Sequence, residues 1–139
     1  MNKIVPVVVA IISHKGTYLL TERKNDDEED RELGTTPTWH FPGGALEFGE
    51  ELHAGLIREI KEETGLNITI TQQLPHIYSA VRRHWHGLLI PYLCSIVGSD
   101  TVHLDHESTD YGWFTLEEID KLHTLPFVQE MAKEAAKLL

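Results

Sequence analysis

The order of apolar and polar positions predicts a chain that starts with strands and continues with helices. Residues 6–12 are rich in β-branched side chains, typical of a strand buried on both faces, and residues 17–23 read as the strand that returns after a polar turn. Pro75 divides the extended stretch 67–83 into two strands, and the apolar positions within 84–97 predict the next strand. By itself, this strand-rich first half suggests only an α+β domain.

Helical periodicity is clearest between residues 52 and 64. One apolar stripe repeats there at about 100° per residue: Leu52, Leu56 and Ile60. Gly65 suits the left-handed position that ends such a helix. The segment 127–139 predicts a final amphipathic helix that begins after Pro126. Thr115 and Glu118 are spaced as a capping box, which predicts a short helix before it.

Three carboxylates gather towards the end of the first helix, at Glu59, Glu62 and Glu63. Their spacing makes them neighbours on the helix surface, where two charges about 5–6 Å apart repel by roughly 3 kcal/mol at an effective dielectric near 20. The helix dipole also disfavours anions in the last turn. Gly55 lies on the same face and is expected to leave room for a ligand. A bound Mg²⁺ or Mn²⁺ ion removes the repulsion, and a solvated acidic face is the alternative.

The segment around these glutamates resembles the signature of the Nudix hydrolases. Five residues separate Gly44 from Glu50, and seven more precede the run REIKEETGL at 58–66. The preceding run WHFPG at 39–43 is also similar to the family's entry to this motif. One departure is His-Ala-Gly at 53–55, where small alanines are usual, but these positions are unspecified. The resemblance implies an α/β fold, an α/β/α sandwich with a mixed central sheet, formed by one domain over residues 1–139.

The resemblance also implies metal-dependent hydrolysis of a nucleoside diphosphate linked to another group. The implied ligands for Mg²⁺, with Mn²⁺ as the alternative, are the carbonyl of Gly43 and the carboxylates of Glu59, Glu62 and Glu63. One of these carboxylates or Glu107 takes the proton from the attacking water. In a polar loop expected at 103–110, Glu107 is either a metal ligand or base, as the resemblance implies, or a solvated side chain.

Further residues of the motif are expected to support the site: Arg58, Glu50, Gly44 and Gly65. Arg58 lies four residues before Glu62 and is expected to pair with it and position the glutamates. Glu50 suits either a metal contact or the positive N-terminus of the helix.

Basic residues outside the motif are candidates for contacts with the substrate phosphates. Arg23 stands at the end of the second expected strand, where the resemblance implies a basic residue near substrate and a surface arginine is the alternative. Arg82 and Arg83 belong to a basic and aromatic cluster at 82–86. That cluster reads as a hairpin tip or as phosphate contacts beside a stacking surface for a base. The acidic segment 25–38 reads as a solvated loop, with a lid as the alternative.

Net charge narrows the class of partner. The 139 residues carry a formal net charge of −10, which argues against a nucleic-acid duplex as partner. No apolar run approaches the length of a membrane span, so no membrane partner is expected. Cys94 is the single cysteine, which excludes an internal disulfide and fits a cytoplasmic location.

These observations predict a hydrolase of small molecules, with a nucleoside triphosphate as the favoured substrate. Nucleotide sugars such as ADP-ribose and dinucleoside polyphosphates are the alternatives. They are less favoured because Pro75 and Tyr78 fall too early in the sequence to be the marker residues of enzymes that act on those substrates. The competing class is a domain that senses a nucleotide without cleaving it. Such a domain could lose the three carboxylates, and their presence here favours the enzyme. The resemblance also makes a homodimer an option.

Overall fold

The structure is a computed structural model that describes residues 3–23, 37–82 and 85–139, without the side chain of Arg82. The strands within this part of the chain are β1 (Ile4–His14), β2 (Thr17–Arg23), β3 (Trp39–His40), β4 (Gly43–Ala45), β5 (Ile68–Gln73), β6 (Tyr78–Arg82), β7 (Trp85–Ile96) and β8 (Ser108–Phe114). The helices are α2 (Leu52–Thr64), α3 (Leu116–Asp120) and α4 (Val128–Lys137).

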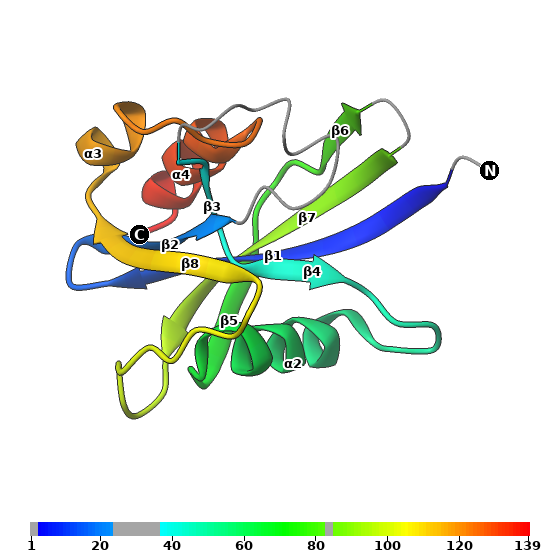
Figure 1. Ribbon diagram of the computed structural model, residues 1–139, viewed down its shortest axis with the longest axis horizontal. Coiled ribbons are helices and arrows are strands. Elements are labelled where there is room, and N and C mark those ends of the chain that lie inside the picture. Colours follow the sequence, from blue (N-terminus) through cyan, green and yellow to red (C-terminus); the bar gives the residue numbers. More distant parts are fainter. Residues whose placement is uncertain (1–2, 24–36, 83–84) are drawn as a thin grey trace.

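These strands form one mixed sheet around β1 and β7, which cross the middle of the molecule (Figure 1). The main path runs β3-β2-β1-β7-β5, and β4, β6 and β8 pair with β1, β7 and β2, respectively. β1 and β7 are parallel from Ile4↔His86 to Ile12↔Cys94, whereas the other pairings are antiparallel. A parallel pair needs a long crossover, and α2 lies in the chain between its two strands.

Successive side chains of β1 enter two different cores. Val8 and Ile12 pack in one cluster with Leu56 of α2, while Val9 packs in the other with Val128 of α4. α2 lies on one face of the sheet, and α3 and α4 lie on the other (Figure 1). The expected α/β/α sandwich is therefore confirmed, as is the prediction that the first strand is buried on both faces.

Most expected elements are present in the structure, although several of their boundaries differ. The polar loop expected at 103–110 is shorter, because β8 begins at Ser108 and pairs with β2. The last helix begins at Val128 and not directly after Pro126, because Phe127 takes a left-handed backbone conformation with φ of 73°. None of the helices in the described residues is long and apolar enough to cross a membrane.

Candidate active site

Both ends of α2 are fixed by local contacts, which hold its glutamates in place. The carboxylate of Glu51 accepts a hydrogen bond from the Ala54 N–H at 2.9 Å, so Glu51 is the N-cap residue. At the other end, Gly65 has φ of 75° and donates its N–H to the carbonyl of Lys61. The left-handed end predicted for Gly65 is confirmed.

Glu63 points inward from the last turn of α2 and is only 3% exposed. Its carboxylate accepts a hydrogen bond from the Gly43 N–H at 3.1 Å. Burial, together with the nearby carboxylates of Glu59, Asp105 and Glu107, raises the pKa of Glu63 to about 8, although the hydrogen bond from Gly43 acts in the opposite direction. The site therefore disfavours a negative charge at Glu63 unless a cation accompanies it.

Glu59 lies against the glycine pair that precedes the helix. A Cβ on Gly44 would lie 2.5 Å from the Glu59 carboxyl carbon, so only glycine leaves space for this side chain. The neighbouring Gly43 is equally constrained, because a Cβ there would lie 2.1 Å from the carbonyl oxygen of Val8. Burial raises the pKa of Glu59, which the adjacent Arg58 partly opposes.

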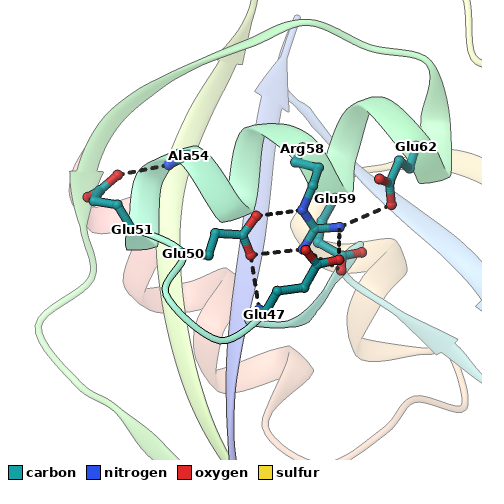
Figure 2. A network of polar contacts seen from close by, with 7 residues as sticks. All are labelled: Glu47, Glu50, Glu51, Ala54, Arg58, Glu59 and Glu62. Carbon is teal, nitrogen blue, oxygen red and sulfur yellow. Dashed lines mark hydrogen bonds and ion pairs between the residues drawn. The ribbon is translucent and has the colours of Figure 1, made fainter.

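Arg58, in the middle of α2, lies at the centre of an acidic network that runs from the turn before the helix to its last turn (Figure 2). Its guanidinium binds Glu50 through two hydrogen bonds, of 2.5 and 2.9 Å. It also contacts Glu62 at 3.1 Å, Glu59 at 3.3 Å and Glu47 at 3.7 Å. Hydrogen bonds from Arg58 and from the Glu47 N–H lower the pKa of Glu50 to about 2. Glu50 is thus joined to Arg58 and the turn, while the N-cap position belongs to the next residue.

The space beside Gly55 is filled by the protein itself. A Cβ on Gly55 would lie 2.6 Å from a methyl carbon of Leu46 and 2.9 Å from an Oε atom of Glu50. The expectation that this glycine leaves room for a ligand is wrong. Its small size instead lets the turn before α2 pack against the helix.

The loop after β7 is tied to the end of α2. The N–H groups of His103 and Asp105 donate to the carbonyls of Thr64 at 2.8 Å and Glu63 at 3.2 Å. The Glu107 N–H then donates to the Asp105 side chain at 3.0 Å. These bonds place Glu107, directly before β8, beside the glutamates of the helix.

A cavity of about 600 Å³ adjoins these carboxylates on the α4 side of the sheet. Its polar lining includes Arg23, His40, Glu63, His106 and Glu107, together with the backbone of Gly43 and Gly44. Its apolar lining comes from β1, β7, α4, the segment before α4 and the residues in and beside β4: Val5, Val7, Val9, Phe41, Ala45, Trp85, Leu89, Leu125, Pro126, Val128 and Met131. An acidic site therefore opens onto a mostly apolar chamber.

Comparison with known proteins identifies the family. A model of the NUDIX domain matches residues 2–137, nearly the whole chain. The chain belongs to the Nudix family. Nucleoside triphosphatase NudI of Escherichia coli O139:H28 is 28% identical over 123 residues, which are 81% of this chain and 83% of that protein. This protein is therefore a Nudix hydrolase, an enzyme of the pyrophosphohydrolase class.

Solved structures of other Nudix proteins share the fold. The MutT protein of Methanosarcina mazei Go1 superposes with a TM-score of 0.80 at 24% identity, covering 99% of this chain and 96% of that one. A Nudix hydrolase of Nitrosomonas europaea gives a TM-score of 0.79 at 25% identity, covering 97% and 90% of the two chains.

Nudix hydrolases generally use a divalent metal ion, and the donor chemistry of this site suits one. Glu59 and Glu63 are carboxylates in an environment that raises the pKa of both, which a hard cation would reverse. Within the described residues, however, no three histidine, cysteine or acidic side chains converge on a ligand position. Arg58 holds Glu59 and Glu62, and the Glu62 side chain is 60% exposed. Glu59 and Glu62 would therefore have to turn away from Arg58 before either could bind a metal ion.

The structure brings some predicted residues of the Nudix site together and leaves others undescribed. Arg23, Gly43, Glu63 and Glu107 line one cavity. Arg83, most of the acidic segment 25–38 and the side chain of Arg82 lie outside the described residues. β6 and β7 pair as far as Arg82↔Trp85, which favours the hairpin interpretation of the 82–86 cluster, although Trp85 also lines the cavity.

Sequence reasoning missed two parts of the site. The amphipathic pattern of the last helix predicts Val128 and Met131 only as inward positions, and no sequence signal separates a cavity wall from a core. From the sequence, Asp105 is only the nearest rival of Glu107 for the role of the loop acid, whereas in the structure it connects the loop to Glu107. The Asp-x-Glu spacing is compatible with such a turn and was the available signal.

Proposed function

We propose that this Nudix hydrolase cleaves a nucleoside diphosphate linked to another group, with a nucleoside triphosphate as the favoured substrate. Water attacks one phosphorus of the diphosphate, and the products are a phosphorylated nucleoside and the phosphorylated remainder. The observation that carries the proposal is the cavity itself, whose polar lining includes Arg23, Glu63 and Glu107 and whose remaining wall is mostly apolar. Such a chamber suits a molecule with phosphates at one end and a base at the other.

Mg²⁺, with Mn²⁺ as the alternative, is the proposed metal. The proposed ligands are the Gly43 carbonyl and the carboxylates of Glu59, Glu62 and Glu63. Bound there, it would neutralise charge on the phosphate oxygens and supply an activated water.

The chain's own groups have separate proposed roles. The Arg23 guanidinium is proposed to bind a phosphate oxygen, as planar cationic donors do well. A carboxylate, either Glu107 or one of the helix glutamates, is proposed to accept the proton of the attacking water. A positioned base of this kind contributes roughly 10²- to 10⁴-fold to the rate. Arg58 is proposed to position Glu50 and the helix glutamates through its ion pairs with them.

A nucleoside triphosphate is favoured over a nucleotide sugar for two reasons. Sequence relatives such as NudI of Escherichia coli O139:H28 are named nucleoside triphosphatases. In addition, a sugar with many hydroxyl groups would leave donors and acceptors unpaired against walls such as Val7, Leu89 and Met131, which costs binding energy.

The test is hydrolysis of a panel of nucleotides with Mg²⁺ or Mn²⁺ and identification of the products. The panel contains nucleoside triphosphates, ADP-ribose and dinucleoside polyphosphates. We expect triphosphates to give the highest kcat/KM and Glu63→Gln to lower it at least about a hundredfold. Glu117→Gln, on an exposed position of α3, is the matched control and should match wild type. Binding of nucleotides without hydrolysis of any of them would overturn the proposal in favour of a sensor.

A further inference from the structure

A large aromatic side chain forms part of the cavity wall far from the carboxylates. Trp85 is the first residue of β7 and lines the cavity together with Leu89 of the same strand. Residues two and four positions apart on a strand share a face, so Trp85, Gly87 and Leu89 all face α4. The other described aromatic residue of the lining, Phe41, is 3% exposed and belongs to the core on this face.

The indole of Trp85 depends on Gly87. A Cβ built on Gly87 would lie 2.2 Å from Cη2 of Trp85 and 2.7 Å from Cζ2 and Cζ3. The six-membered ring therefore lies over the Gly87 backbone, in space that any other residue would fill. Glycine weakens a strand interior, and its presence there marks a close approach by another group. Here that group is the indole.

Strand register separates this ring from the proposed phosphate end of the site. Gly87 pairs with Val5 of β1, and Gly43 pairs with Val9 of the same strand. Four residues along a strand span about 13 Å. In addition, β4 and β7 pair with opposite edges of β1. The indole and the carboxylates thus occupy two ends of one chamber.

The wall between these two ends is apolar. The described lining residues nearest to Trp85 by strand register are Val5, Val7 and Leu89, none of which offers a side-chain hydrogen bond. A planar group could bind there by stacking and burial, whereas a charged or hydroxyl-rich group would find no hydrogen-bond partners.

We propose that Trp85, seated over Gly87, is the surface on which the nucleobase of the substrate stacks. The inference rests on the proposed function and adds to it the base-binding residue and the glycine that positions it. Stacking is insensitive to the exocyclic groups of a base, because every base has a π face. The site therefore selects for a base over a sugar more strongly than for one base over another.

The test compares Trp85→Ala, Trp85→Phe, Gly87→Ala and the double variant Trp85→Ala/Gly87→Ala. Kinetics are measured with the best nucleoside triphosphate of the panel, and inorganic triphosphate serves as a competitor that has no base. Trp113→Phe is the matched control, because this indole packs in the cluster on the α2 face.

Trp85→Ala should raise KM about tenfold with little change in kcat, as loss of a base stack does. Trp85→Phe should have a smaller effect, and Trp113→Phe none. The inhibition constant of inorganic triphosphate should not change in any variant. Gly87→Ala should behave like Trp85→Ala, and the double variant should be no worse than Trp85→Ala, because the glycine acts only through the indole.

An unchanged KM in Trp85→Ala would overturn the inference, and so would weaker binding of inorganic triphosphate in the same variant. Independent, additive effects of Trp85→Ala and Gly87→Ala would also overturn it. Trp85→Phe keeps a flat ring and decides the matter if Gly87→Ala does not fold. If wild type hydrolyses no nucleoside triphosphate, the proposed function has failed; if it does and Trp85→Ala has the wild-type KM, only the role of Trp85 has failed.

Discussion

Glu63, a proposed metal ligand that would act in its charged form, is held where negative charge is unfavourable. It is 3% exposed, and its closest described hydrogen-bond donor is the Gly43 N–H. The sequence shows that Glu63 falls on the apolar stripe of the helix, so its burial was predictable. Its bond to Gly43 was not, because that contact depends on how β4 packs against α2.

This conflict predicts how the metal-free protein responds to pH. A pKa of about 8 for Glu63 exceeds the ordinary value of 4.5, so the folded state binds the proton more tightly than the unfolded state. The contribution of Glu63 to the free energy of unfolding is therefore full below the unfolded-state pKa and is lost as pH rises through about 8. We expect wild type in a metal chelator to lose up to about 4 kcal/mol of unfolding free energy between pH 5 and pH 8.

Glu63→Gln should remove most of this dependence, because glutamine does not titrate. The measurement is Tm by calorimetry across that pH range, with Glu117→Gln as a control that keeps the wild-type slope. A wild-type slope in Glu63→Gln would show that another group is responsible.

Asp105 offers a second prediction at the scale of single residues. Its side chain accepts the Glu107 N–H at 3.0 Å, and its own N–H donates to the Glu63 carbonyl. Asparagine keeps an acceptor oxygen at the same place, whereas alanine does not. Asp105→Ala should therefore lower kcat about tenfold or more by releasing Glu107, and Asp105→Asn should keep most of the activity. A loss in Asp105→Asn as large as in Asp105→Ala would assign the charge of Asp105 a direct role.

Among the elements, α2 was the most predictable from sequence. Its apolar stripe and its end at Gly65 follow from periodicity and local capping, which need no tertiary information, whereas its N-cap residue is Glu51 and not Glu50. The role of Gly55 was not predictable, because its neighbour Leu46 approaches from the turn before the helix. The cavity was also not predictable from the sequence, since it lies between segments far apart in the chain, such as β1 and α4.

The Arg58 network predicts how α2 supports the proposed metal site. Arg58 binds Glu50 twice and also contacts Glu47, Glu59 and Glu62, so its removal frees four carboxylates at once. Residues that orient metal ligands typically change metal affinity or activity by roughly 10- to 100-fold when they are lost. We expect Arg58→Ala to raise the Mg²⁺ concentration for half-maximal activity within this range.

Lys61→Ala is the control for this experiment. Lys61 is a cation of the same helix whose ammonium contacts the Gly65 carbonyl. An equal effect of both substitutions would point to the general charge of the helix and not to the network.

At the scale of the whole molecule, the sheet separates two hydrophobic cores. Cys94 lies in the core beneath α2, so its reaction with a thiol reagent shows whether that core opens. This thiol is 1% exposed, and burial raises its pKa to about 12. Thiolates are the reactive form, so we expect iodoacetamide at pH 8 to leave the native protein unmodified.

Labelling should begin only where denaturant unfolds the chain globally, as judged by mass spectrometry beside circular dichroism. Glu117→Cys, on an exposed position of α3, is the positive control and should react in native buffer. Rapid labelling of Cys94 in native buffer would mean that this core opens locally.

The alternation of side chains along β1 has a consequence for how such an enzyme can diverge. Val5, Val7 and Val9 line the chamber, whereas Val8 and its even-numbered neighbours pack under α2. Mutations at the odd positions can reshape the chamber without disturbing the packing of α2. Residues that shape the chamber and residues that hold the glutamate helix thus alternate along a single strand, so either set can evolve while the other is conserved.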